Sequence, residues 1–351
     1  MTSAPPPARA VPSRIGCAVL GATGTVGQRF VQLLRGHPRL ELRAVGASPR
    51  SQGRPYGEAA TWRLDGEMPE AAAGLLLEDA DAIARRDDVR VVFSALPGGE
   101  AGPVERALAD AGKAVFTNAR DLRLAPDVPL LIPEVNPDHL DLVRGRRGFV
   151  VANGNCSAIV LTLALAPLHR AFGLREVHVT TFQGLSGAGH PGVPSLDILD
   201  NVVPYIGGEE DKLETEPQRT LGTPTAPADF AVFPTCARVP VREGHLESVH
   251  VRLARDAGLD EVRAAFEGFR GPPEVAGLHL APERPIHVDD RPDRPQPRLD
   301  RDREDGMAVT VGRLREGGGW LRFWVLGHNT LRGAAGQSVL NAEYADAVGL
   351  L

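Results

Sequence analysis

The stretch IGCAVLGATGTVGQRFVQLL, residues 15–34, contains an apolar run, three evenly spaced glycines and a helical pattern. Residues 15–20 are apolar and end at a glycine, as expected of a buried strand, and residues 28–34 have apolar side chains at helical spacing. A strand, a glycine-rich turn and a helix in this order are typical of the phosphate-binding turn of a dinucleotide-binding parallel sheet. Glycines that merely end a strand are the alternative. We predict cofactor contacts from this turn, at Gly21, Thr23, Gly24, Thr25 and Val26.

The alternation of strand and helix patterns continues to about residue 152. This alternation predicts a parallel sheet with helices on both of its faces. Apolar runs predict further strands at 40–47, 89–96, 114–117 and 130–132, and residues 101–111 have a helical pattern.

The loops that follow the second and third strands indicate which cofactor binds. In an NAD site, an acidic residue near the end of the second strand binds the ribose 2′-hydroxyl. Here that strand is followed by Ser48, Arg50 and Ser51, whose hydroxyls and guanidinium suit the 2′-phosphate of NADP. An ordinary polar turn is the alternative. We also expect Ser94 and Ala95 to line the cofactor crevice, because the carboxyl ends of parallel strands face it.

A cysteine near the middle of the chain is the candidate nucleophile. Cys156 follows the apolar run 149–152 and the turn residues 153–155, and the apolar stretch 158–166 after it is long enough for a helix. A cysteine at a helix N-terminus is favoured as a thiolate by the free N–H groups and the helix dipole. A buried structural cysteine is the alternative.

Beyond residue 153 the pattern changes to fewer helices and several alternating strands. We expect strands at 176–183, 229–241 and 247–253, with the second and third of these paired, and a hairpin near 307–326. Residues 281–306 are rich in Asp, Arg and Pro and are expected to form a surface excursion.

These patterns together predict an α/β protein with two domains. The first is a Rossmann-type dinucleotide-binding domain, and the second is an α+β catalytic and dimerisation domain with a mixed sheet. The expected bounds are 1–13 for a disordered tail, 14–152 for the first domain, 153–327 for the second, and 328–351 for a C-terminal helix that completes the first.

Composition excludes several classes of protein. The chain has 351 residues, with 42% hydrophobic and 24% charged residues, and a net charge of -6 gives no reason to expect nucleic acid. No apolar run approaches the ~20 residues of a transmembrane helix. Three widely spaced cysteines form neither a disulfide framework nor a CxxC metal site. We therefore predict a cytoplasmic enzyme without a metal.

A thiol beside a nicotinamide cofactor indicates aldehyde oxidoreduction through a thioester. The thiol adds to an aldehyde, hydride transfer leaves a thioester, and a second nucleophile resolves it. A base must take the thiol proton and return it, and His245 is the best candidate because it lies on a turn beside Gly244. Any single histidine is more often a surface or structural residue.

Five separated motifs resemble the aspartate-semialdehyde dehydrogenases, especially the branch found in archaea, fungi and some bacteria. The resemblance runs from about residue 15 to the C-terminus. The motifs, in order, are GATGTVG at 21–27, GNCS at 154–157, GLSGAGHPGVPS at 184–195, GGEE at 207–210 and HNTLRGAA at 328–335.

The resemblance implies reversible conversion of L-aspartate 4-semialdehyde, phosphate and NADP to 4-phospho-L-aspartate and NADPH, on the route to lysine, threonine and methionine. It also implies at least a homodimer, or a homotetramer. The implied roles are Cys156 as acyl-forming nucleophile, His245 as acid and base, Arg238 for the substrate carboxylate, Glu209 for its amino group, Gln183 for the acyl group, Lys212, Asn155 and Arg123 (with Arg120 as the alternative) for phosphate, and Ser186, Gly187, Asn329 and Thr330 for the cofactor.

Three other interpretations stay open from the sequence. N-acetyl-γ-glutamyl-phosphate reductase has similar chemistry, but its cysteine motif usually reads Pro-Gly-Cys-Tyr where this chain has Gly-Asn-Cys-Ser. A malonyl-CoA reductase would use the same cysteine, although Glu209, Lys212 and Arg238 suit an amino-acid phosphate better. An inactive binding or scaffold relative is the third, and the presence of Cys156 and His245 argues against it.

Overall fold

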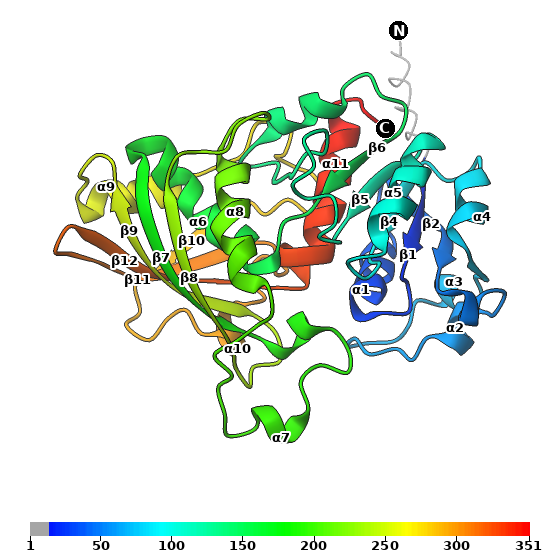
Figure 1. Ribbon diagram of the computed structural model, residues 1–351, viewed down its shortest axis with the longest axis horizontal. Helices are drawn as coiled ribbons and strands as arrows, with labels where there is room; N and C mark the ends of the chain where they lie inside the picture. Colours follow the sequence, from blue (N-terminus) through cyan, green and yellow to red (C-terminus); the bar gives the residue numbers. More distant parts are fainter. Residues whose placement is uncertain (1–13) are drawn as a thin grey trace, which may run out of the picture.

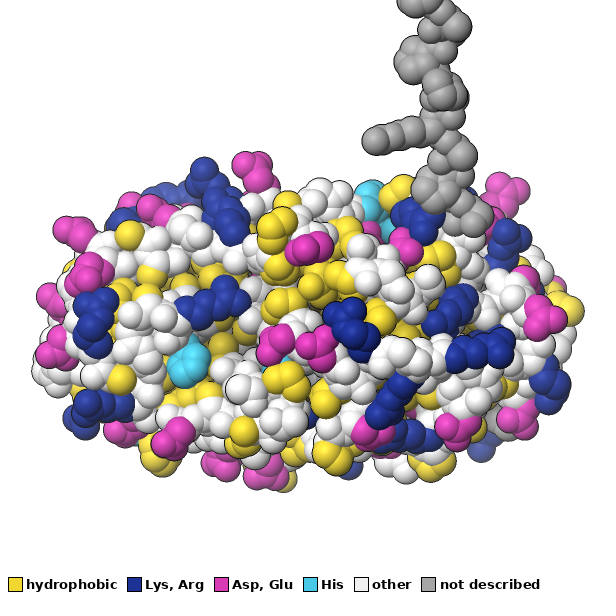
Figure 2. All heavy atoms as spheres, turned by 90° about the horizontal axis from the view of Figure 1, so that it is seen from above, with side chains coloured by type: hydrophobic (Ala, Val, Ile, Leu, Met, Phe, Trp, Pro, Cys, Tyr) yellow, Lys and Arg dark blue, Asp and Glu magenta, His cyan; other side chains and the backbone are white. Residues whose placement is uncertain are grey.

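The computed structural model describes residues 14–351 and contains two six-stranded sheets that lie side by side (Figure 1). The tail expected at residues 1–13 lies outside the described residues. One sheet is wholly parallel and the other is mixed, so the predicted fold class is confirmed. No helix among residues 14–351 is long and apolar enough to cross a membrane. On the face seen in Figure 2, hydrophobic side chains are visible between charged side chains of both signs.

The parallel sheet has the strand order β3-β2-β1-β4-β5-β6. In this doubly wound order the chain changes direction between β1 and β4, and ligands bind in the crevice beyond the carboxyl ends of the strands at that point. The strand bounds are β1 Ile15–Leu20, β2 Leu40–Gly46, β3 Leu77–Glu78, β4 Val91–Ser94, β5 Ala114–Thr117 and β6 Phe149–Ala152.

Helices cover both faces of the parallel sheet. One face packs against α1 (Thr25–Leu34) and α11 (Gly336–Ala347), and the other packs against α4 (Ala80–Arg85) and α5 (Ala101–Asp110). Helix α11 therefore returns from the end of the chain to the first sheet. The shorter helical turns are η1 Pro49–Ser51, α2 Tyr56–Ala59, α3 Glu70–Ala73 and η2 Pro137–Val143.

The mixed sheet has the order β10-β11-β12-β9-β7-β8 and packs one face against helices α6, α8 and α9. Its strands are β7 Leu174–Gln183, β8 Ala231–Arg238, β9 His245–Leu253, β10 Ile286–Asp289, β11 Val309–Gly317 and β12 Trp320–Gly327. The remaining helical segments are α6 Cys156–Phe172, η3 Leu185–Ala188, α7 Ser195–Ile198, α8 Glu209–Leu221, α9 Leu259–Gly268, α10 Pro297–Asp300 and the π-helical turn η4 Leu331–Ala335.

Three local expectations were wrong. Strands β8 and β9 do not pair with each other, because both pair with β7, one parallel and one antiparallel. Residues 130–132 form no strand, and only Leu130 makes an isolated bridge, to Ala152. The excursion 281–306 contributes the edge strand β10, whose Asp289 is paired with Arg291 and Arg303.

Candidate active site

A cavity of about 710 Å³ lies where the carboxyl ends of the parallel strands meet the start of α6. Elements of both sheets supply its walls, so residues far apart in the sequence converge there. Among the predicted site residues, those that line it are Val26, Arg123, Asn155, Cys156, Ser186, Gly187, Glu209, Lys212, Arg238, Asn329 and Thr330.

Cys156 is the first residue of α6, and its sulfur faces His245. The Sγ and Nε2 atoms are 3.1 Å apart. The N-cap is Asn155, whose Oδ1 accepts from the N–H groups of Ser157 at 3.0 Å and Ala158 at 3.1 Å. Because Asn155 occupies these two N–H groups, they are not free for a thiolate, contrary to the expectation from the sequence.

The resting pair is uncharged. Burial, reinforced by the Glu209 carboxylate, raises the pKa of the Cys156 thiol to about 12. Burial, together with the nearby Arg238 guanidinium, lowers the pKa of His245 to about 3. Desolvation, which outweighs the Arg123, Arg238 and Lys212 cations, therefore favours the thiol over the resting thiolate expected from the sequence.

A backbone amide selects the tautomer of His245. The N–H of Gly184 donates to Nδ1 at 3.1 Å, so Nδ1 bears a lone pair and the neutral ring has its proton on Nε2, toward sulfur. The imidazole is therefore a hydrogen-bond donor toward Cys156 in this arrangement.

Strand pairing places three predicted substrate residues side by side. Gln183 at the end of β7 is in register with Arg238 at the end of β8 and with His245 at the start of β9. Arg238 NH1 donates to the carbonyl of Gly184 at 2.7 Å, which leaves the rest of its guanidinium for a ligand. Gln183 is fully buried and donates to Thr181 Oγ1 at 3.2 Å, so it lies behind the cavity wall.

Helix α8 presents alternating charges to the cavity. Glu209 accepts from Lys212 Nζ at 2.8 Å and from Asn155 Nδ2 at 2.8 Å. Although burial opposes ionisation, the Lys212 ammonium holds the pKa of Glu209 below its usual value. Two helical turns after Glu209, Glu216 accepts from the backbone N–H of Asn155 and from Arg123. The two α8 carboxylates, Glu209 and Glu216, thus bind Asn155 in the turn before Cys156 and also pair with the cations of Lys212 and Arg123.

The two candidate phosphate arginines differ in their surroundings. Arg123 is buried and paired with Glu216 at 2.9 Å, and it also donates to the carbonyl of Asn118 at 2.8 Å. Arg120 is exposed, lines the same cavity, and makes no side-chain hydrogen bond or ion pair within residues 14–351. Both line the cavity, so either guanidinium can contribute a cation to a phosphate bound there.

The glycine turn after β1 has the shape expected of a phosphate-binding loop. Gly21 has φ +67°, and a Cβ there would lie 2.5 Å from the carbonyl oxygen of Ala95. A Cβ at Gly27 would lie 2.1 Å from the oxygen of Gly21, so α1 packs closely on the turn. At Gly24, which precedes α1, the nearest atom would be 3.5 Å away, so the backbone is open to a ligand. These residues fit a dinucleotide pyrophosphate.

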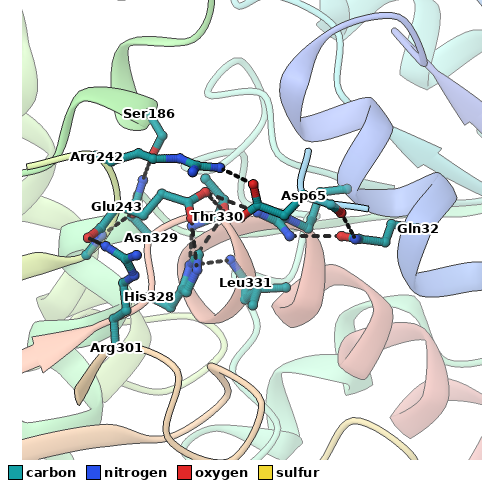
Figure 3. A network of polar contacts seen from close by, with 12 residues as sticks. Gln32, Asp65, Ser186, Arg242, Glu243, Arg301, His328, Asn329, Thr330 and Leu331 are labelled. Carbon is teal, nitrogen blue, oxygen red and sulfur yellow. Dashed lines mark hydrogen bonds and ion pairs between the residues drawn. The ribbon is translucent and has the colours of Figure 1, made fainter. Parts of the chain in front are cut away.

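The other predicted cofactor residues fall into three groups. Ser186, Gly187, Asn329 and Thr330 line the cavity, and Asn329 Nδ2 donates to Ser186 Oγ at 2.8 Å (Figure 3). Ser94 is fully buried, and its hydroxyl donates to Glu105 at 2.7 Å, so that hydroxyl faces α5 rather than the crevice. Gly21, Thr23, Gly24, Thr25, Ser48, Arg50, Ser51 and Ala95 lie around the carboxyl ends of β1, β2 and β4, outside the lining of the cavity.

Two acidic residues at the site were not found from the sequence. Glu216 lies seven residues after Glu209, a helical spacing that places both on one face of α8, and this spacing was a usable signal. Glu243 accepts from Arg29 of α1 at 3.0 Å, and only the fold brings these residues together.

Sequence comparison agrees with this site. The family profile described as "Semialdehyde dehydrogenase, NAD binding domain" matches residues 17–143, and "Semialdehyde dehydrogenase, dimerisation domain" matches residues 165–332. Aspartate-semialdehyde dehydrogenase of Methanothermobacter thermautotrophicus is 52% identical over 94% of this chain and 98% of its own length. The chain belongs to the aspartate-semialdehyde dehydrogenase family. The dimerisation domain indicates a homo-oligomer.

Solved structures of this family have the same fold. Aspartate-semialdehyde dehydrogenase from Candida albicans with NADP superposes with a TM-score of 0.89 at 40% identity, over 97% of this chain and 100% of that one. Aspartate-semialdehyde dehydrogenase II from Vibrio cholerae, complexed with ASA, gives a TM-score of 0.75 at 28% identity, over 95% of this chain and 98% of that one. The resemblance drawn from the five motifs is therefore confirmed.

Proposed function

We propose that this protein is an NADP-dependent aspartate-semialdehyde dehydrogenase. It would reduce 4-phospho-L-aspartate to L-aspartate 4-semialdehyde with release of phosphate, reversibly, on the route to lysine, threonine and methionine. The observation that supports this most is Cys156, which lines the same cavity as Arg238, Glu209 and Lys212 and whose Sγ lies 3.1 Å from Nε2 of the buried His245.

Cys156 is the proposed nucleophile. In the reductive direction its sulfur attacks C4 of the acyl phosphate, and the bond from C4 to the phosphate oxygen breaks. Phosphate is released, and the acyl group stays on the enzyme as a thioester of Cys156. NADPH, when bound, supplies the hydride that reduces the thioester carbon. The C–S bond then breaks, which frees sulfur and releases the aldehyde.

Charged side chains are placed to recognise the amino-acid end of the substrate. The free part of the Arg238 guanidinium suits a bidentate pair with the α-carboxylate. The ionised Glu209 suits the ammonium group. In the resting site Glu209 holds Lys212 at 2.8 Å, so we propose that the substrate ammonium takes the place of Lys212 at Glu209.

The phosphate end would then gain the cations that substrate binding releases. Lys212 is free to turn toward phosphate once Glu209 binds the ammonium, and Arg123 stands on the other side of Asn155, paired with Glu216. Asn155 links both carboxylates and can donate to phosphate if its side chain leaves Glu209. Gln183, in register with Arg238 and His245, would orient the acyl group from behind.

His245 is placed to move a proton between sulfur and the substrate. Acceptance of the thiol proton at Nε2 requires a proton on Nδ1, and Gly184 prevents this while its N–H donates to Nδ1. We expect that hydrogen bond to break when the substrate enters, with movement of the glycine-rich segment 184–189. The neutral resting pair is thereby kept unreactive until the substrate is present.

The turn 21–27 would hold the pyrophosphate of NADP, and Ser48, Arg50 and Ser51 would hold its 2′-phosphate. Ser48, Arg50 and Ser51 include no carboxylate that would repel the 2′-phosphate. Ala95, Ser186, Gly187, Asn329 and Thr330 would surround the nicotinamide end. Three free cysteines fit a reducing compartment, which supports placing the enzyme in the cytoplasm, and we propose a homodimer or homotetramer.

A spectrophotometric assay of NADPH tests the proposal. We expect phosphate-dependent reduction of NADP by L-aspartate 4-semialdehyde. N-acetylglutamate 5-semialdehyde and malonyl-CoA, assayed with each cofactor in its reactive direction, should give at most trace rates. Absence of turnover with aspartate semialdehyde, or a higher kcat/KM with either comparator, would refute the assignment.

A further inference from the structure

We propose that Glu243 is a positioning residue that couples the cofactor helix α1 to the placement of His245. The proposal rests on the proposed function, because it assumes that NADP binds at the start of α1 and that His245 acts on the substrate. Figure 3 shows the polar network around the Glu243 carboxylate, which lies between the turn that precedes β9 and the segment that follows β12.

The carboxylate of Glu243 is held from two sides. Arg29 of α1 donates to its Oε1 at 3.0 Å, and Thr330 Oγ1 donates to the same oxygen at 3.3 Å. The Nε2 atom of His328 lies 3.5 Å from Oε2. The Arg29 and Glu243 side chains are only 12% and 10% exposed, so solvent screens this pair weakly.

The turn that carries Glu243 leads directly into His245. Arg301 NH1 donates to the Glu243 carbonyl at 3.1 Å, and the Gly244 N–H donates to Asn329 Oδ1 at 2.8 Å. His245 is the first residue of β9, so the position of this turn decides where the imidazole stands relative to Cys156. A shift in the Glu243 carboxylate would therefore be passed to the imidazole through two peptide bonds.

Glu243 remains ionised at neutral pH. Burial favours its neutral form, but the hydrogen bond from His328 and the charges of His328, Arg29 and Arg242 outweigh burial and lower the pKa of Glu243 to about 2. Removal of either member of the Arg29–Glu243 pair would leave the other charge buried without its partner.

The position of Arg29 connects this pair to the cofactor. Arg29 is the fifth residue of α1 and lies two residues after the glycine turn 21–27, so ordering of that turn by a pyrophosphate would also help to fix the guanidinium. A second pair, Arg242 with Asp65 at 3.0 Å, joins the same turn to the loop after α2, whose Asp65 carbonyl accepts from Gln32 of α1, but its side chains are 59% and 85% exposed. Such an exposed pair contributes little, which makes it the matched control.

Crossed effects in three variants test the coupling. We would measure the Kd of NADP by calorimetry, and kcat at saturating substrate and cofactor, for Arg29→Gln, Glu243→Gln and the double variant. We expect Arg29→Gln to lower kcat and Glu243→Gln to raise the Kd of NADP, each by about fivefold or more. The double variant should be no worse than the more severe single variant, and Arg29→Lys should restore part of kcat.

Asp65→Asn is the control and should leave Kd and kcat at wild-type values. The proposal is overturned if Arg29→Gln changes only the Kd of NADP and Glu243→Gln changes only kcat. It is also overturned if the effects of the two substitutions are additive in the double variant, or if Asp65→Asn changes Kd and kcat as much as these substitutions do. If Glu243→Gln does not fold, as judged by circular dichroism, Arg29→Gln and Arg29→Lys still decide the result. Failure of the proposed function would appear separately, as wild-type protein that binds NADP without turning over aspartate semialdehyde.

Discussion

In the parallel sheet the site residues lie in loops that follow the strands, whereas in the mixed sheet they belong to the strands themselves. The turn 21–27 and the loop 48–51 can shift without breaking strand pairs. Gln183, Arg238 and His245, by contrast, are fixed in register across three neighbouring strands. The loops suit a cofactor that enters and leaves, and the strand ends suit chemistry that depends on sub-ångström placement.

The largest effect is expected at the nucleophile Cys156, which follows the parallel strand β6 and faces His245 on the fixed side of the comparison. Cys156→Ala should lower kcat for phosphate-dependent reduction of NADP by about 10⁴-fold or more, because no other group at the site can form the thioester. Steady-state assays would measure the rate, and NADP binding should persist because the cofactor turn is untouched. Substantial turnover in this variant would remove Cys156 from its role.

The protonation state of that cysteine gives the second test. With a thiol pKa of about 12, the thiolate fraction at neutral pH is very small and should grow about tenfold per pH unit. Alkylation of ligand-free enzyme by iodoacetamide should therefore rise steadily between about pH 7 and pH 10, with Cys156→Ala as the background. A plateau near neutral pH would instead show a resting thiolate.

A smaller loss is expected when the guanidinium of the strand β8 is replaced. Arg238→Lys keeps the charge but cannot form two parallel hydrogen bonds, so kcat/KM for aspartate semialdehyde should fall about 10–100-fold, mainly through KM. Arg252→Lys, on the exposed side of β9, is the control. An unchanged KM would rule out Arg238 as the carboxylate clamp.

The amide that selects the histidine tautomer can be removed with a matched control. Gly184 has φ −67° and ψ 155°, which proline can adopt, while any Cβ there would lie 3.0 Å from the carbonyl oxygen of Gly244. Gly184→Pro and Gly184→Ala share this crowding, but only the alanine variant keeps the N–H. Because loss of this N–H frees the tautomer that can accept the thiol proton at Nε2, we expect iodoacetamide to alkylate Cys156 of the ligand-free proline variant about tenfold faster than that of the alanine variant at neutral pH. Equal rates would show that the hydrogen bond to Nδ1 does not matter.

The smallest effect is expected in the loop after β2. Replacing Ser48 with Ala and Arg50 with Gln should lower the preference for NADP over NAD by about tenfold, since one charge-assisted hydrogen bond is lost with little change in kcat. The ratio of kcat/KM for the two cofactors measures this. An unaltered ratio would place the 2′-phosphate elsewhere.

The features that could be predicted from sequence were the local ones. The glycine turn needs only a strand, three small residues and a helix within twenty positions, and the structure has them at 15–34. The start of the helix at Cys156 was equally local. The pairing of β8 and β9 was not, because alternation identifies strands without naming their neighbours.

The charges around the site show the same limit. A helical spacing could have indicated Glu216, but its contacts with Arg123 and Asn155 depend on how α8 packs against α6. The neutral state of Cys156 was missed because desolvation depends on the whole cavity, whereas the helix terminus is visible in the sequence. Residues 281–306 looked like a surface loop because only Ile286 of β10 is a buried core residue, while the buried Asp289 and Asp300 are paired with Arg303 and Arg294.

The position of α11 at the end of the chain has a consequence for folding during synthesis. All six strands of the parallel sheet have been synthesised once Ala152 is added, yet Val339, Ala342 and Ala345 of α11, which complete the core on one face, come about half a chain later. Until α11 is synthesised, the part of that sheet face which α11 covers is exposed, including aromatic side chains such as Phe93 and Phe116. Incomplete chains that lack α11 should therefore aggregate readily and bind chaperones. Removal of about the last fifteen residues should impair the folding of the parallel sheet more than that of the mixed sheet.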